Sequence, residues 1–144
     1  MMDGRKYAFG LVVGMFVAAC GCTSQDLPEN VLASAQKAYD DALVAIESGE
    51  YAAARPLLDT AIAAGGLPVD LAVDAYLKRS MCLAEGGDFQ GAQADIETAA
   101  QGASDLEYVH VARGFLLAKQ GDKAGAEREY QQARSLNPKV ILPK

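Results

Sequence analysis

The chain has 144 residues, of which 51% are hydrophobic and 22% are charged, and its formal net charge is −6. This length is enough for one hydrophobic core. The negative charge argues against nucleic acid as a partner, because phosphate backbones are bound mainly by Lys and Arg. No pair among the three cysteines and the single histidine has metal-ligand spacing, so neither a metal site nor a cofactor is expected.

The first 19 residues have the pattern of an export signal. Arg5 and Lys6 precede an unbroken run of apolar and small residues from position 7 to position 19. As a helix this run would be about 20 Å long, too short to cross a hydrocarbon core of about 30 Å. We therefore expect residues 1–19 to be a signal peptide that is cleaved. An ordinary secretory signal and an N-terminal transmembrane anchor are the alternatives.

The residues that close this run, Val17-Ala18-Ala19-Cys20, resemble the bacterial lipobox. In that motif the cysteine is acylated, so the resemblance implies a covalent lipid such as palmitate on Cys20. A diacylated cysteine buries enough methylene groups to hold a soluble domain on a membrane. The chain would then be a bacterial lipoprotein of the cell envelope. Gly21 stands where an Asp would favour the inner membrane, which slightly favours the periplasmic side of the outer membrane.

Beyond the signal, the chain divides into a short tether and a helical region. Residues 20–30 are rich in turn-forming and polar residues and predict the tether. Apolar residues then recur at three- and four-residue steps, which predicts helices. Their expected ranges are 31–48, 51–64, 70–85, 89–101, 105–120 and 123–135. Pro56 lacks an N–H group, so we expect it to bend the second helix or to loosen its start.

The second, fourth and sixth of these helices share one pattern. Gly121-Asp122, Ala126, Tyr130 and Ala133 are matched 34 residues upstream by Gly87-Asp88, Ala92, Ile96 and Ala99, and a further 38 upstream by Gly49-Glu50, Ala54, Leu58 and Ala61. The spacing resembles the tetratricopeptide repeat, a helix-turn-helix unit of about 34 residues. The resemblance implies an all-α fold in which three such pairs stack as a short α-solenoid. The domain would span 31–140, with units at about 35–68, 73–106 and 107–140 and a tail at 141–144.

Two reactive residues are interpreted as structural. Cys82 lies inside an expected helix, where a small apolar side chain is needed, and no spacing requires a disulfide with Cys22. His110 falls at a position where the repeat family places a packing residue. The sequence contains no Ser, His and acid set and no Gly-rich phosphate loop, so we expect no enzymatic activity.

In the tetratricopeptide family the first helix of each pair lines the concave side of the superhelix. Carried over to this chain, the resemblance implies a groove lined by Tyr39, Leu43, Ile46, Leu77, Met81, Ala84, Tyr108, Val111, Phe115 and Ala118. Tyr39, Leu43, Leu77, Met81, Tyr108, Val111 and Phe115 are the main candidates for partner contact. Family members that grip a carboxylate have lysine, asparagine and arginine at such positions, so a carboxylate clamp is not supported here.

An exposed apolar groove usually marks an interaction site. We therefore expect a membrane-anchored adaptor that binds an amphipathic helix or extended apolar segment of another envelope protein. The alternative is a self-associating structural module whose groove is closed by a second copy, as a homodimer, or by its own chain. Residues 31–39 and Val140-Ile141-Leu142 are the candidates for self-coverage, and a carrier of a hydrophobic small molecule is a more distant alternative.

The first unit is expected to be the least stable of the three. Ala38 and Ala45 occupy positions where the repeat family usually has larger residues. Smaller side chains bury less apolar area on packing.

Overall fold

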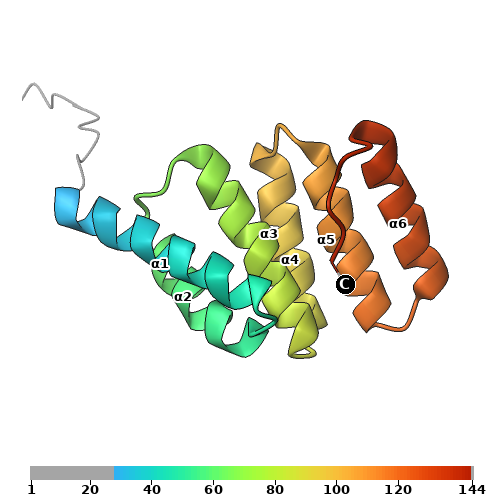
Figure 1. The fold of residues 1–144 in the computed structure, drawn as a ribbon, viewed down its shortest axis with the longest axis horizontal. Coiled ribbons are helices and arrows are strands. Elements are labelled where there is room, and N and C mark those ends of the chain that lie inside the picture. The colour runs from blue at the N-terminus through green and yellow to red at the C-terminus, as the bar shows by residue number, and fades with distance from the viewer. Residues whose placement is uncertain (1–27, 144) are drawn as a thin grey trace, which may run out of the picture.

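The computed structural model describes residues 28–143, and the chain forms six α-helices there (Figure 1). They are α1 (Glu29–Glu47), α2 (Tyr51–Ala64), α3 (Val69–Glu85), α4 (Phe89–Gly102), α5 (Leu106–Lys119) and α6 (Lys123–Leu136). Every helix end lies within two residues of its expected position. The signal peptide, Cys20, Cys22 and most of the tether lie outside the described residues.

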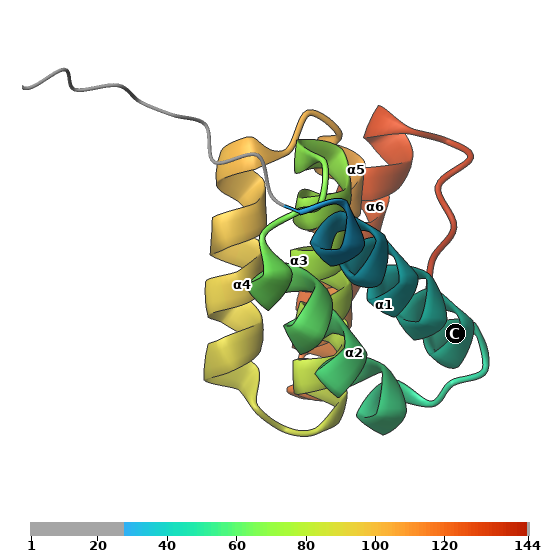
Figure 2. The ribbon, with the colours of Figure 1, turned by 90° about the vertical axis from the view of Figure 1, so that its left-hand side faces the viewer.

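Consecutive helices form three pairs, α1 with α2, α3 with α4, and α5 with α6. Between pairs, α2 packs on α3, and α5 contacts both α3 and α4. Figure 2 shows α4 on the opposite side of the molecule from the C-terminal segment. This packing confirms the all-α class and the short tetratricopeptide-like solenoid.

Three glycines at equivalent positions turn the chain between the helices of each pair. Gly49, Gly87 and Gly121 have φ angles of 78°, 83° and 90°. Side chains strongly disfavour this left-handed region, whereas glycine adopts it without a steric penalty. The repeating glycine is therefore required by the backbone of the turn.

The second and third pairs also share a helix cap that the first pair lacks. The carboxylates of Asp88 and Asp122 accept hydrogen bonds from the backbone N–H groups of Gly91 (2.9 Å) and Gly125 (2.8 Å). A Cβ atom on either glycine would overlap the capping carboxylate. In the first pair Glu50 takes the capping position and makes no such hydrogen bond.

The hydrophobic core consists of two clusters. The larger one joins α3, α4 and α5 around side chains such as Ile96 and Phe115. The smaller one joins α1, α2 and α3, is built largely from alanine, and includes Cys82. Cys82 is buried, as its interpretation as a core residue requires, and burial raises the pKa of its thiol to about 11. Tyr51 packs against both clusters and connects them.

Helix α2 runs without interruption through Pro56. The N–H groups of Ala53 and Ala54 both donate to the carbonyl of Glu50 at 3.0 Å, so the first turn is intact. The loosened start that we considered is therefore wrong. Proline removes a single hydrogen bond early in the helix, and the packing of Leu58 and Ala61 in the smaller cluster holds the turns that follow.

Candidate interaction groove

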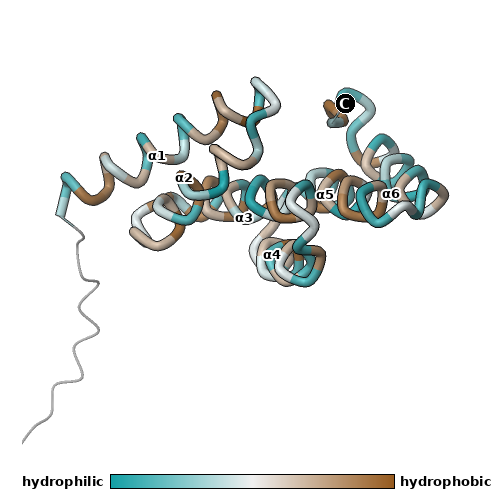
Figure 3. Tube along the Cα trace, turned by 90° about the horizontal axis from the view of Figure 1, so that it is seen from below, coloured by the Kyte–Doolittle hydropathy of each residue, from teal (hydrophilic) through white to brown (hydrophobic). Residues whose placement is uncertain are grey.

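A groove of about 710 Å³ opens on one side of the helix array. Its floor is formed by α3 and α5, one wall by the end of α1 and the turn into α2, and the other wall by residues 139–143. Figure 3 shows α1 and the C-terminal segment on the same side of the row that contains α3, α5 and α6, with α4 on the other side. The lining residues are Ile46, Glu47, Gly49, Tyr51, Asp74, Leu77, Lys78, Met81, Tyr108, Val111, Ala112, Lys139, Ile141, Leu142 and Pro143.

Four of the seven main candidates from the sequence meet in this groove. Leu77 and Met81 come from α3, and Tyr108 and Val111 come from α5. Leu77, Met81 and Val111 are buried and form the floor of the groove. Tyr108, in contrast, is 45% exposed. Among these four, Tyr108 therefore offers a partner the largest contact area.

Tyr39, Leu43 and Phe115 do not line the groove. Phe115 is buried in the larger cluster, where its ring centroid lies 5.9 Å from that of Tyr51. Tyr39 is buried and Leu43 half-buried, and both pack in the smaller cluster between α1 and α2. Most apolar side chains of α1 pack against α2. Ile46, near the C-terminal end of α1, is the one among them that lines the groove.

Several lining residues were not among the candidates expected from the sequence, although two of them, Asp74 and Lys78, have a signal there. Asp74 and Lys78 each precede a floor residue, Leu77 and Met81, by three positions on α3. Residues three or four apart share one face of a helix, so the spacing alone places all four together. Val140-Ile141-Leu142 were expected as a segment that could fold over the groove, and Ile141 and Leu142 do line one side of it. The contribution of Tyr51 depends on how distant segments pack and had no local signal.

A hydrogen bond ties α1 to α3 beside the groove. The hydroxyl of Tyr39 donates to the Asp74 carboxylate at an oxygen distance of 2.6 Å. Burial, reinforced by this hydrogen bond, raises the pKa of the Tyr39 phenol above its ordinary value. The phenol therefore stays protonated and acts as a donor at neutral pH, which fixes α1 relative to the groove floor.

The C-terminal wall is positioned by Asn137. Its side-chain amide donates to the Glu107 carboxylate of α5 at 3.1 Å, and its side-chain oxygen accepts from the backbone N–H of Lys139 at 3.0 Å. The backbone N–H of Val140 donates to the carbonyl of Asn137 at 3.0 Å. These bonds end α6 and direct the tail back along α5, where Ile141 remains 87% exposed. The tail borders the groove but leaves it open.

The main ion-pair network lies outside the groove lining. The Arg79 guanidinium donates two hydrogen bonds, of 2.7 and 2.8 Å, to the buried carboxylate of Asp95 and a third, of 2.9 Å, to Asp59. Arg79 thus joins α2, α3 and α4. His110 contacts the Glu129 carboxylate at 2.7 Å and joins α5 to α6, consistent with its interpretation as a packing residue. Both arrangements hold helices together.

Residues 28–143 contain no group of three or more His, Cys, Asp or Glu side chains that could hold a metal ion. None of its helices combines the length and the hydropathy that a bilayer span requires. The lipidation site expected at Cys20 lies outside the described residues.

Comparison with protein families matches residues 107–140 to the tetratricopeptide repeat. The match covers α5, α6 and the start of the tail, and it coincides with the third unit expected from the sequence. Comparison with curated proteins and with solved structures gave no match. The matched repeat and the packing of the helix pairs support a tetratricopeptide-type protein. Such repeats commonly bind protein partners and are generally not enzymes.

Proposed function

We propose that this chain is a non-enzymatic adaptor that binds a segment of another envelope protein in the groove between α1 and the C-terminal tail. The observation that carries the proposal is the open groove, in which an apolar floor lies between exposed apolar side chains on α5 and on the tail. Water in contact with such a surface is released when a partner covers it, which favours binding.

The shape of the groove favours a segment with one apolar face. Leu77, Met81 and Val111 are buried, so the floor itself exposes little side-chain area to a partner. Tyr108 and Ile141 stand beside that floor from two different elements. A partner side chain placed between them would be enclosed on several sides, which is how binding hot spots form. An amphipathic helix or an extended apolar segment provides such a side chain while keeping its other face in water.

The membrane attachment in this proposal rests on the lipobox-like residues before Cys20. The eight residues 21–28 between Cys20 and α1 would span at most about 29 Å if fully extended, which keeps the domain close to its membrane. An acidic domain is repelled by anionic lipid, so the acyl chains on Cys20 would supply the attachment. Proteins of the same bacterial envelope are then the partners within reach, and Gly21 slightly favours the outer membrane.

The proposal is tested by affinity capture from envelope extract with the full chain as bait. The variants Tyr108→Asp and Ile141→Asp place a charge on exposed groove residues. Val44→Asp is the matched control, because Val44 is 64% exposed on α1 and does not line the groove. Circular dichroism establishes that each variant is folded. We expect a partner that the unchanged chain and the Val44 variant retain and that both groove variants lose.

The alternative, closure of the groove by a second copy, has a different signature in the same set of variants. Sedimentation of the unchanged chain would then show a concentration-dependent dimer that both groove variants dissociate. Capture of the same proteins by all variants, without a dimer, would remove the groove from the function altogether.

A further inference from the structure

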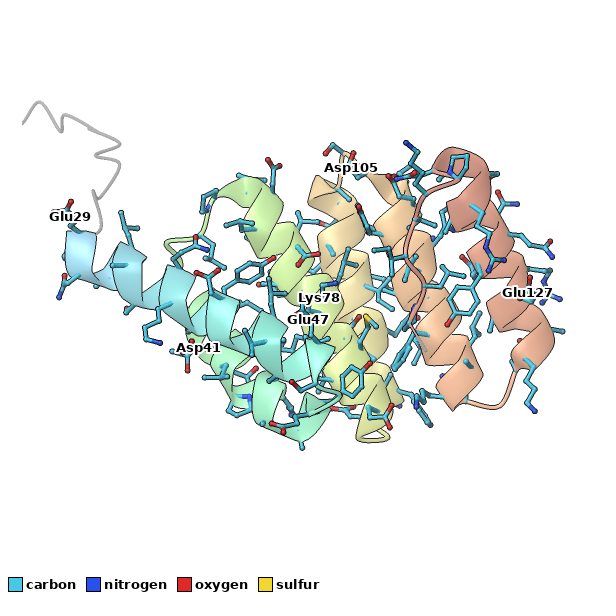
Figure 4. The ribbon with its side chains drawn as sticks, in the orientation of Figure 1. Glu29, Asp41, Glu47, Lys78, Asp105 and Glu127 are labelled. Carbon is cyan, nitrogen blue, oxygen red and sulfur yellow. The ribbon has the colours of Figure 1, made fainter. Side chains whose placement is uncertain are left out.

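The groove continues at one end into a smaller cavity of about 120 Å³. The two share Asp74, Leu77 and Tyr108, so they form one continuous surface. The smaller cavity lies where α3 and α5 begin and is also lined by Asp70, Val73, Gly102, Ala103, Ser104 and Asp105. Figure 4 labels Asp105 at this end, and Lys78 and Glu47 farther along the groove.

Three carboxylates of this end cavity have no cationic partner. In residues 28–143 six carboxylates form salt bridges, those of Asp41, Asp59, Glu85, Asp95, Glu127 and Glu129. Asp70, Asp74 and Asp105 are among the carboxylates of these residues that form none. Asp105 stands at the capping position of α5, yet its side chain makes no capping hydrogen bond. Its carboxylate is therefore not committed to the helix end, unlike those of Asp88 and Asp122.

The wider part of the groove is balanced in charge. Glu47 and Asp74 line it together with Lys78 and Lys139, two acids with two bases. The end cavity adds Asp70 and Asp105 and no base. The negative potential of the binding surface is therefore concentrated at the end where α3 and α5 begin.

We infer that the partner segment carries a lysine or arginine beside its apolar residues, and that this cation lies in the end cavity among Asp70, Asp74 and Asp105. The inference rests on the function proposed above, because it assigns the chemistry of the segment that fills the groove. The exposed ring of Tyr108 borders the cavity and can stack on the alkyl chain or the charge of such a residue. Charge complementarity of this kind fixes the direction of a bound segment.

The geometry of α3 also sets the spacing within the partner. Asp74 and Met81 are separated by about 10 Å along the helix axis at 1.5 Å per residue. An apolar side chain over Met81 and a cation beside Asp74 would thus be about three residues apart in an extended segment, and about seven apart in a helix.

The test uses three fluorescent helical peptides with the same apolar face and with Lys, Gln or Glu seven residues from the central apolar position. Fluorescence anisotropy with the full chain measures their Kd values. We expect the Lys peptide to bind about fivefold more tightly than the Glu peptide at low salt, with the Gln peptide between them. The contrast should shrink as salt screens the charges.

Reversing the charge of the end cavity tests whether the preference for the Lys peptide arises there. The double variant Asp70→Lys with Asp105→Lys should reverse the order, so that the Glu peptide binds most tightly. The control is Glu97→Lys with Glu127→Lys, which changes the net charge equally on exposed residues of α4 and α6 outside the groove. This control should keep the original order, and circular dichroism checks the fold of both.

The outcomes separate this inference from the proposed function. Equal Kd values for the three peptides, together with loss of binding in Tyr108→Asp, overturn the inference and leave the groove as a binding site. Reversal by the control double variant also overturns it, because the effect would then follow net charge. Failure to bind any peptide, or binding that Tyr108→Asp leaves unchanged, overturns both. A dimer that excludes the peptides assigns the groove to a second copy and likewise overturns both.

Discussion

The ring of Tyr130 on α6 packs directly over Gly114 on α5, at the place where a side chain at position 114 would begin. The equivalent positions in the other two pairs hold Ser80 with Ile96 and Ala42 with Leu58. In each pair a small residue on the first helix thus stands at the position equivalent to Gly114, and a large residue on the second helix stands at the position equivalent to Tyr130. The smallest of the three, glycine, occurs with the bulkiest, tyrosine, which is the compensation that close packing requires.

Gly114→Ala should destabilise the third pair. The added methyl group would overlap the Tyr130 ring, and overpacking of this kind costs about 1–3 kcal/mol. Urea denaturation of the full chain measures the change in unfolding free energy. Gly86→Ala is the control, because a Cβ there would meet its nearest atoms at an ordinary 3.5 Å. Equal stability of the two variants would contradict the packing described for Tyr130.

Tyr39→Phe should weaken the attachment of α1 to α3. The variant removes the hydrogen bond to Asp74 and leaves that carboxylate without its donor, at a cost of about 1–2 kcal/mol. Thermal unfolding at pH 7 measures the loss.

Tyr39 should also affect how the folding stability depends on pH in the alkaline range. Burial and the hydrogen bond to Asp74 raise the pKa of the Tyr39 phenol on folding, so its contribution is complete below the ordinary tyrosine pKa of about 10. Folding stability should fall as pH rises above that value, because the unfolded phenol then releases its proton more readily than the folded one. Tyr39→Phe should make this fall shallower. A pH dependence identical to that of the unchanged chain would show that the Tyr39 phenol is not protected.

Hydrogen exchange should show the first pair opening before the other two. The cluster that joins α1 to α2 is built largely from alanine, and Glu50 provides no side-chain cap for α2. Amides in α1 and α2 should therefore exchange faster than those in α3, α4, α5 and α6. Uniform protection across the six helices would contradict this expectation.

Deletion of residues 139–144 should weaken binding of an apolar peptide to the groove. The deletion removes the wall that contains Ile141 and Leu142 but touches none of the contacts between helices. The unfolding free energy should therefore change by less than about 1 kcal/mol, while the Kd rises. Tighter binding after the deletion would mean that the tail covers the groove and competes with the partner.

Cys20→Ser should release the protein from the membrane. Without its thiol the residue cannot be acylated, so labelling with a palmitate analogue and sedimentation with the membrane fraction should both be lost. Cys22→Ser is the matched control. The three residues before Cys22, Ala19-Cys20-Gly21, lack the branched residue with which the motif begins, so Cys22 is not expected to be acylated. Retained labelling in the Cys20 variant would overturn the lipobox assignment.

The sequence by itself determined the helices and their pairing. Apolar residues at three- and four-residue steps fix the helical faces, and the glycines at 49, 87 and 121 fix the turns between them. These signals are local, so they can be interpreted without knowledge of the rest of the fold. The groove implied by the tetratricopeptide resemblance included Leu77, Met81, Tyr108 and Val111, of which Leu77 and Val111 stand at equivalent positions 34 residues apart.

Only the tertiary structure decided which apolar residues are buried in the core and which remain accessible to a partner. Tyr39 and Phe115 lie on the first helices of their pairs, as Tyr108 does, yet packing between α1 and α2 and between α3 and α5 buries them. The wall formed by residues 139–143 has no periodic signal at all, since its position depends on the bond between Asn137 and Glu107, 30 residues apart in sequence. The burial of these side chains and the position of the groove wall both depend on contacts between segments that are distant in sequence. A periodic pattern describes one helix at a time, so it carries no information about such contacts.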